Sequence, residues 1–339
     1  MPVVSTLMGL GVFPASHRQF LGLTGMHGHK PSNLAVHKAD LVIAAGVRFS
    51  DRVTGDRSQY ADGKRVIHIE IDPAEIDKNV TADIALIGDL KASLEGLIKE
   101  IESGRGTDRA QWWATIDAWR TSAIMAAPGA GSGVGAAACS GESRLSGPWL
   151  MRHMAAAGAG RPIIYVTDVG QHQMWAAQHL APEEPRCWLT SGGLGTMGFG
   201  LPAGIGAQLA RPDRRVVVIA GDGGFKMTGN ELYTAAMFEL PLTVVVVDNG
   251  CLGMVRQWQE LFYKKRYAST ILPSRFDFVA FAGVFGVPAV LAETRDQFAA
   301  AYDEALAAAG PRLIVARIST ADIVSPMVAP GGRLHEFVV

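Results

Sequence analysis

The sequence predicts an α/β protein of two Rossmann-like domains, each a doubly wound parallel sheet. Two observations support this prediction. Short runs rich in Val and Ile alternate with segments that have apolar residues at helical spacing, and the runs end in Gly or Asp. In the first domain, expected over 1–105, the strands are predicted at 40–47, 65–72 and 83–89, and a helix at 89–102.

The second domain is expected over 148–339. Between the two domains, 106–147 holds a predicted helix at 108–120 and then an Ala-, Gly- and Ser-rich stretch at 121–147 that has the composition of a linker. The second domain shows the same alternation. Its strands are predicted at 161–170, 215–223, 242–249 and 312–318, and its helices near 171, from about 229 and at 294–309.

Two predicted helix starts have the spacing of a capping box, in which a Thr side chain and an acid or amide three residues later bond each other's backbone. One pairs Thr228 with Glu231 and the other pairs Thr294 with Gln297. We therefore expect helices to begin at both places.

Composition excludes several functional classes. The 339 residues are 48% hydrophobic and 19% charged, with a net charge of −1, which is typical of a globular protein without a nucleic-acid-binding field. The three cysteines (Cys139, Cys187 and Cys251) lack the spacing of a zinc site or a disulfide framework. No apolar run reaches the ~18–20 residues of a membrane span. We expect a cytoplasmic protein with no nucleic-acid or membrane partner.

Acidic and amide side chains follow two neighbouring strands. Asp222 lies in a GDG turn and Asn249, 27 positions later, lies in a DNG turn. Ligands of parallel α/β sheets bind outside the carboxyl ends of the strands, and oxygen ligands suit Mg²⁺. Residues 168–172 follow a third strand end. Glycine turns of this kind also occur as ordinary left-handed turns in Rossmann-like folds, but the paired motifs favour a site for a metal and a diphosphate.

The GDG and DNG pair resembles the motif of thiamine diphosphate-dependent enzymes, with Asp248 in place of the usual first Asn. Longer segments resemble the catalytic large subunit of acetolactate synthase (acetohydroxyacid synthase), and the resemblance covers nearly all the chain except 103–147. These segments are STLMGLGVFP (5–14), LGLTGMHGHKPSNLAVHKADLVIAAGVRFSDRVTG (21–55), IEIDPAEIDKN (69–79), VGQHQMWAAQH (169–179), TSGGLGTMGFGLPAGIGAQLA (190–210), LGMVRQWQELFYKKRYAST (252–270) and SPMVAPGG (325–332).

The resemblance implies the following cofactor and metal residues. The Mg²⁺ ligands would be Asp222, Asn249 and the backbone carbonyl of Cys251. Thiamine diphosphate would be bound by Gln171, His172, Gly195, Met197, Gly221, Gly223, Gly224 and Asn249.

Three residues would act at the reacting end of the cofactor: Met197, Met254 and Trp258. By resemblance Met197 is the apolar wedge beneath the thiamine, although a methionine can equally fill a gap in a core. Trp258, with Met254 and Gln257 nearby, resembles the family's selector for the second 2-oxo acid. The alternative for Trp258 is simple packing, since Trp is usually highly buried.

The first domain resembles the family's FAD-binding domain. Arg48 and Arg52 would meet the FAD pyrophosphate, and Asp72 an adenosine hydroxyl. His27 and His29 lack a third metal ligand, so we interpret them as loop residues. The complete implied set is Gly25, Met26, His27, Gly28, Gly46, Arg48, Arg52, Asp72, Gly88 and Asp89.

The implied activity is decarboxylation of pyruvate and transfer of its two-carbon unit to pyruvate or 2-oxobutyrate, in branched-chain amino acid biosynthesis. The implied partners are further copies, as a dimer or tetramer, and a small regulatory subunit. The family's activating Glu lies in an N-terminal domain to which nothing in 1–339 corresponds, so we expect a truncated product or half of a split enzyme, inactive by itself. Two alternatives stay open: another thiamine diphosphate carboligase or decarboxylase, and a cofactor-binding protein without turnover.

Overall fold

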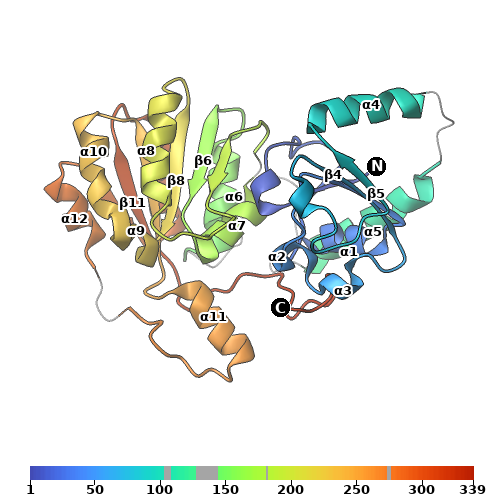
Figure 1. The fold of residues 1–339 in the computed structure, drawn as a ribbon. Coiled ribbons are helices and arrows are strands. Elements are labelled where there is room, and N and C mark those ends of the chain that lie inside the picture. Colours follow the sequence, from blue (N-terminus) through green and yellow to red (C-terminus); the bar gives the residue numbers. More distant parts are fainter. Residues whose placement is uncertain (103–107, 127–143, 181, 273–275) are drawn as a thin grey trace. The chain divides into compact units, whose positions relative to one another are not determined.

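The computed structural model describes residues 1–102, 108–126, 144–180, 182–272 and 276–339, which form two compact units (Figure 1). Unit 1 comprises the described residues of 1–6, 18–140 and 325–339, and unit 2 those of 7–17 and 141–324. Most of the predicted linker, 127–143 with Cys139, lies outside the described residues.

Unit 1 is built on a parallel sheet of order β3-β4-β5, beside a parallel pair β1-β2. The three predicted strands and both predicted helices, now α4 and α5, are confirmed. Its elements are β1 (Val3–Ser5), β2 (Phe20–Leu23), α1 (Lys30–Lys38), β3 (Leu41–Ala45), α2 (Asp51–Thr54), α3 (Arg57–Tyr60), β4 (Arg65–Glu70), β5 (Ile84–Ile87), α4 (Leu90–Glu102) and α5 (Ala110–Ala126).

Apolar side chains from distant parts of the chain form the core of unit 1. Ile116 of α5 is fully buried against Leu21 and Ala35, with three tryptophans of α5 packed around it. Residues 325–339, which the sequence analysis included in the second domain, also pack in unit 1. Leu334 joins its core, and the Val328 N–H donates to the Met26 carbonyl over 2.8 Å.

Unit 2 is a doubly wound domain on one parallel sheet of six strands, in the order β10-β11-β9-β8-β6-β7. The predicted strands and the parallel α/β class are confirmed. Its elements are α6 (Gly147–Ala157), β6 (Ile163–Thr167), α7 (Gln171–His179), β7 (Trp188–Thr190), α8 (Gly200–Ala210), β8 (Arg215–Gly221), α9 (Asp222–Thr228), α10 (Leu232–Met237), β9 (Leu242–Asp248), α11 (Gly253–Phe262), α12 (Phe278–Val284), β10 (Ala289–Ala292), α13 (Arg295–Ala307) and β11 (Arg312–Arg317).

Both faces of this sheet are covered, as the valine-rich central strands require. Alternate residues such as Val216 and Val218 pack with side chains of α8, α9, α10 and α12. The intervening residues, such as Val217 and Ile219, are equally buried, and α7 and α13 contact the sheet there. Strands buried on both faces read as continuous apolar runs, which is the pattern of β8 and β9.

The two predicted capping boxes had different outcomes. The box of Thr294 and Gln297 is present at the start of α13, with both reciprocal bonds formed. The box at Thr228 was wrong. A 3₁₀ turn (Gly229–Glu231) begins there and leads into α10, but the Thr228 side chain accepts no capping bond, and Thr228 is also the last residue of α9. The Thr228 hydroxyl instead donates to the Gly198 carbonyl over 3.0 Å.

Among the helices in the described residues, none combines the length and the apolar character needed to cross a membrane.

Candidate functional site

The residues predicted to bind a metal lie at one edge of the unit 2 sheet. β8 and β9 are adjacent and parallel, with Gly221 opposite Val247, so Asp222 and Asn249 follow neighbouring strand ends. Both are buried, with 3% and 8% of their surface exposed. The Cys251 N–H donates to Asn249 Oδ1 over 3.1 Å, which places the Cys251 backbone in the same turn.

The Asp222 carboxylate lies near a second acid, Asp248, and the positive charge of Lys226 offsets this only in part. Burial, followed by the nearby charge of Asp248, raises the pKa of Asp222 to about 7, while Gly223 N–H donates to its Oδ1 over 2.9 Å. A buried carboxylate with a raised pKa is stabilised by an added cation. No group of three or more His, Cys, Asp or Glu side chains is placed to hold a metal ion in the described part of the chain, so a metal here would also use amide and backbone oxygens.

The side-chain amide of Gln171 forms hydrogen bonds with other residues of unit 2. Its Nε2 donates to Gln257 Oε1 and to the Asp322 carbonyl, both over 2.9 Å, and its Oε1 accepts from Asn249 Nδ2 over 3.1 Å. Gln171 is a predicted ligand of thiamine diphosphate. Its side chain contacts Asn249, the predicted metal ligand.

His172 provides a buried polar atom with no protein partner among the described residues. It is 5% exposed, and no hydrogen bond is formed by its Nε2. Burial lowers the pKa of His172 to about 4 despite the opposing charge of Asp168, so the ring is neutral at neutral pH. A Cβ added at Gly170 or Gly221 would come within 3.0 Å of the ring, so these glycines make room for it. An Nε2 in this state suits a hydrogen bond with a bound ligand.

The Asp168 carboxylate, absent from the predicted site residues, organises the turn that carries Met197. It is 1% exposed and accepts backbone N–H bonds from Val169 (2.8 Å), Gly198 (3.1 Å) and Gly200 (2.8 Å). A signal for it was available, since Asp168 lies near the end of a predicted strand. The turn brings the Met197 Cε within 3.5 Å of the place where a Cβ would lie on Gly223, so Met197 reaches the GDG turn. Gly195 starts this turn with a φ of +65°.

Gly224 also approaches Asp168 closely, because a Cβ on Gly224 would meet the Asp168 carboxylate. The predicted Gly223 and Gly224 therefore lie between Met197, Leu252 and Asp168.

Helix α11 carries Met254 and Trp258, and both side chains are half-buried. The Trp258 ring packs edge-on against Phe262, with centroids 5.6 Å apart. The helix lies beyond the carboxyl ends of the sheet strands (Figure 1). Its one buried residue is Gln257, which the sequence analysis named only as a neighbour of Trp258.

In unit 1, the predicted flavin residues of 25–28 form a turn against the backbone of Arg52. The Met26 N–H donates to the Arg52 carbonyl over 2.8 Å, and Gly28 N–H closes the turn onto Gly25. Asn33, fully buried and not predicted, bonds both the N–H and the carbonyl of Gly25 over 2.9 Å. Burial, with the charge of Arg52, lowers the pKa of His27 to about 4.

The remaining predicted flavin residues follow the three strand ends of the unit 1 sheet. Gly46 and Arg48 follow β3, Asp72 follows β4, and Gly88 and Asp89 follow β5. Gly46 has a φ of +62° and open space where a Cβ would lie. The carboxylates of Asp72 and Asp89 each accept a nearby backbone N–H over 2.9 Å.

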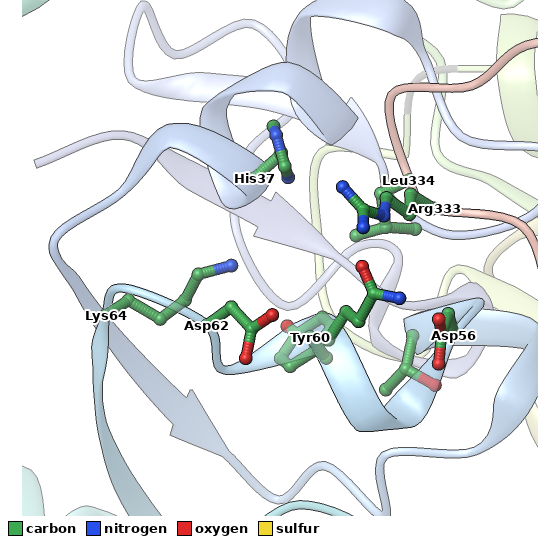
Figure 2. Close-up of a pocket in the computed structure, with 9 residues that line it drawn as sticks. His37, Asp56, Tyr60, Asp62, Lys64, Arg333 and Leu334 are labelled. Carbon is green, nitrogen blue, oxygen red and sulfur yellow. The ribbon is translucent and has the colours of Figure 1, made fainter.

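A separate hollow of about 60 Å³ lies elsewhere in unit 1 (Figure 2). Lys64 and Arg333 border it together with Asp56 and Asp62, so its charges balance. None of the predicted flavin residues lines it. It is therefore not part of the predicted flavin site.

Two family descriptions match parts of this chain. Residues 168–316 match the family "Thiamine pyrophosphate enzyme, C-terminal TPP binding domain", and residues 1–97 match "Thiamine pyrophosphate enzyme, central domain". The acetolactate synthase of Mycobacterium leprae (strain TN) is 42% identical over 99% of this chain and 53% of its own length. The acetolactate synthase isozyme 2 large subunit of Escherichia coli (strain K12) is 42% identical over 100% and 58%. The acetolactate synthase large subunit of Parasynechococcus marenigrum (strain WH8102) is 44% identical over 98% and 52%.

The chain spans about half the length of the curated relatives it matches. The match over 1–97 lies mostly in unit 1 and the match over 168–316 lies in unit 2. The latter begins at Asp168, at the strand end where the site starts. The chain belongs to the thiamine pyrophosphate enzyme family, with its central domain and its cofactor-binding domain, and is similar throughout to acetolactate synthase large subunits.

Proposed function

We propose that this chain is the cofactor-binding part of an acetolactate synthase, which joins the two-carbon unit of pyruvate to a second pyruvate or to 2-oxobutyrate. The observation that carries the proposal is the gathering of Asp222, Asn249, His172 and Met197 at one sheet edge. Similarity to acetolactate synthases over 98–100% of the chain supports the choice of substrate class.

Asp222, Asn249 and the Cys251 carbonyl would hold Mg²⁺. The residues present fit this ion, because the buried Asp222 carboxylate needs a cation and all three groups offer the hard oxygen ligands that Mg²⁺ prefers. The Mg²⁺ would bridge the protein to the diphosphate. The buried Nε2 of His172 would donate to a diphosphate oxygen. Because the ring already donates to the Asp168 backbone, this requires the protonated ring, which the negative charge of the bound diphosphate would favour.

Bound thiamine diphosphate supplies the carbon nucleophile that adds to the carbonyl of a 2-oxo acid. Met197 would support the cofactor from beneath, since it is large, apolar and held next to Gly223. Trp258 and Met254, on α11, would contact the second 2-oxo acid. Their half-buried side chains leave surface for such a contact.

We also propose that unit 1 binds FAD through the turn at 25–28 and the strand ends of its sheet. The glycine at position 46, with open space beside it, suits a close backbone approach to a ligand. A cytoplasmic homo-oligomer with a regulatory subunit completes the proposal, on the ground of the similarity to synthase large subunits.

Calorimetry of thiamine diphosphate binding tests the site. The 339-residue chain is expected to bind the cofactor with Mg²⁺ present and to lose it when EDTA removes the metal. Asp222→Ala should abolish the metal-dependent binding, whereas Asp213→Ala, which removes an exposed aspartate, should not. Equal affinity with and without Mg²⁺ would contradict the proposed site. Absence of acetolactate from pyruvate, for a full-length protein with bound cofactor, would contradict the proposed reaction.

A further inference from the structure

Gln257 is an unusual residue to be buried. It lies on α11, the helix of Met254 and Trp258, and no other residue of that helix is buried. Its surface is fully inaccessible to solvent. Burying an amide is unfavourable unless its polar atoms are hydrogen-bonded. The contacts of Gln257 therefore indicate why an amide is present at this position.

Gln257 is the middle member of a series of hydrogen-bonded side-chain amides that ends at Asn249. Its Oε1 accepts from the Val324 N–H (2.8 Å) and from Gln171 Nε2 (2.9 Å), and its Nε2 donates to the Val324 carbonyl (3.0 Å). Gln171 Nε2 also donates to the Asp322 carbonyl (2.9 Å). With its N–H groups used in this way, Gln171 presents its Oε1 to Asn249 Nδ2.

Backbone groups, which cannot rotate, determine which way each side-chain amide in this series is oriented. An amide side chain can exchange its oxygen and nitrogen by turning about its last bond. At Val324, however, the N–H must meet an oxygen and the carbonyl must meet an N–H, which fixes the orientation of Gln257. Gln257 and the Asp322 carbonyl then fix Gln171, and Gln171 fixes Asn249.

The orientation of Asn249 decides whether it can bind a cation. In the observed orientation its Nδ2 faces Gln171 Oε1, and its Oδ1 faces the Cys251 N–H and keeps a second lone pair. The reverse orientation would place two oxygens together at Gln171 and two N–H groups together at Cys251. It would also point an N–H toward the metal, where an oxygen is needed.

We infer that Gln257 is a positioning residue that acts through Gln171 to present the Asn249 oxygen to the metal. The inference rests on the proposed Mg²⁺ site. Because Gln257 also lies on the helix that carries Trp258, the same amide ties α11 to 322–324 and to the metal-binding turn. Mutation of residues that hydrogen-bond and orient metal ligands typically lowers metal affinity 10–100-fold.

The test is the Mg²⁺ dissociation constant, measured by calorimetry with thiamine diphosphate present. Gln257→Met keeps the volume of the side chain and removes the amide, and it should weaken Mg²⁺ binding about 10–100-fold. Gln257→Glu keeps oxygens that accept from Gln171 and Val324, and it should retain more of the affinity than Gln257→Met. The matched control is Gln259→Met, on the same helix. The side-chain amide of Gln259 forms its hydrogen bonds with the loop at 268–270 instead, so Mg²⁺ affinity should stay unchanged.

A double-mutant cycle separates this role from simple structural support. If Gln257 acts through Asn249, then Gln257→Met should cost little further Mg²⁺ affinity in a chain that already carries Asn249→Ala. Additive losses, or equal Mg²⁺ affinity in the Gln257→Met and Gln259→Met variants, would overturn the inference. Failure of the unaltered chain to bind Mg²⁺ with the cofactor would instead contradict the proposed function.

Discussion

The backbone N–H of Gly200 donates to Asp168 Oδ2 over 2.8 Å, which ties the start of α8 to the end of β6. The other carboxylate oxygen accepts from Gly198 and Val169. One buried side chain thus fixes both sides of the turn that presents Met197. The turn is held from its other side by the Thr228 hydroxyl.

Replacement of Asp168 should therefore affect both stability and cofactor binding. Asp168→Ala leaves buried N–H groups without an acceptor, and each such group lowers the free energy of unfolding by about 1–3 kcal/mol. In a domain of this size, each kcal/mol lost lowers the thermal unfolding midpoint by about 2–4 °C. We expect a fall of several degrees and weaker thiamine diphosphate binding by calorimetry. As a control, Asp277→Ala removes a carboxylate that accepts two backbone N–H groups at the start of α12, whereas Asp168 accepts three. It should lower stability alone, and an equal loss of cofactor affinity there would contradict this role.

A methyl group at Gly253 should directly disturb the hydrogen bond between the side-chain amides of Gln171 and Asn249. A Cβ there would meet Gln171 Oε1 and lie 2.5 Å from Asn249 Nδ2, so Gly253→Ala should push the two side chains apart. We expect weaker Mg²⁺ binding and lower stability. Gly206→Ala, at a helical glycine with open space around it, should instead stabilise by about 0.5–1 kcal/mol. Chemical denaturation and calorimetry of both variants check this, and an unchanged Mg²⁺ affinity in Gly253→Ala would count against the close packing.

The buried His172 should make the cofactor-free chain sensitive to acid. Its pKa is about 4 in the folded chain and 6.5 in the unfolded one, so the unfolded state binds more protons between these values. The stability that this group contributes is present above pH 6.5 and is lost as the pH falls through 4. A shift of this size corresponds to about 3 kcal/mol.

Denaturation of the unaltered chain and of His172→Gln at several pH values measures this term. The variant should lose less stability than the unaltered chain between pH 6.5 and 4. Asp222 contributes the opposite slope, because its pKa is raised to about 7, but it is present in both proteins and cancels in the comparison. Parallel curves for the two proteins would contradict the burial of a neutral His172.

Trp258 should set the choice of the second substrate. One methylene in an apolar pocket is worth about 10–200-fold in specificity. We expect a full-length protein that contains this chain to prefer 2-oxobutyrate as the second substrate, because the indole of Trp258 can contact the extra methyl group. Trp258→Leu should therefore remove most of this preference and spare acetolactate formation. Trp149→Leu, at a half-buried tryptophan of α6, is the control and should leave the product ratio unchanged. The ratio of the two products from mixed 2-oxo acids is the measurement, and the same ratio in Trp258→Leu as in the unaltered protein would refute the assignment.

The sequence was sufficient to predict β6, β8, β9 and β11 of unit 2, because these strands are buried on both faces and leave a continuous apolar pattern. It also indicated β3, β4 and β5 from their Val- and Ile-rich runs, but not the short strands β1, β2, β7 and β10. It also indicated the α13 capping box, which depends only on residues three apart. The Thr228 box failed because the same local pattern competed with a tertiary bond to Gly198. Local spacing alone carries no information about such a distant partner.

The candidate site was predictable where a residue follows a strand end, as Asp222 and Asn249 do. The supporting contacts were not. Gln171 lies 86 positions from Gln257 and Asp168 lies 32 from Gly200, and these pairs meet only once the sheet is formed. A buried amide on α11 is likewise invisible in the sequence, since glutamine on a helix is usually exposed.

The central claim is that Asp222 and Asn249 hold the metal of a bound thiamine diphosphate. A crystal structure with thiamine diphosphate and Mn²⁺ in place of Mg²⁺ tests it most directly, because the anomalous signal of Mn²⁺ locates the ion. We expect a single ion bound by an Asp222 carboxylate oxygen, Asn249 Oδ1 and the Cys251 carbonyl, at about 2.0–2.3 Å. Cofactor density with the ion elsewhere, or with Asn249 Nδ2 turned toward it, would contradict the account.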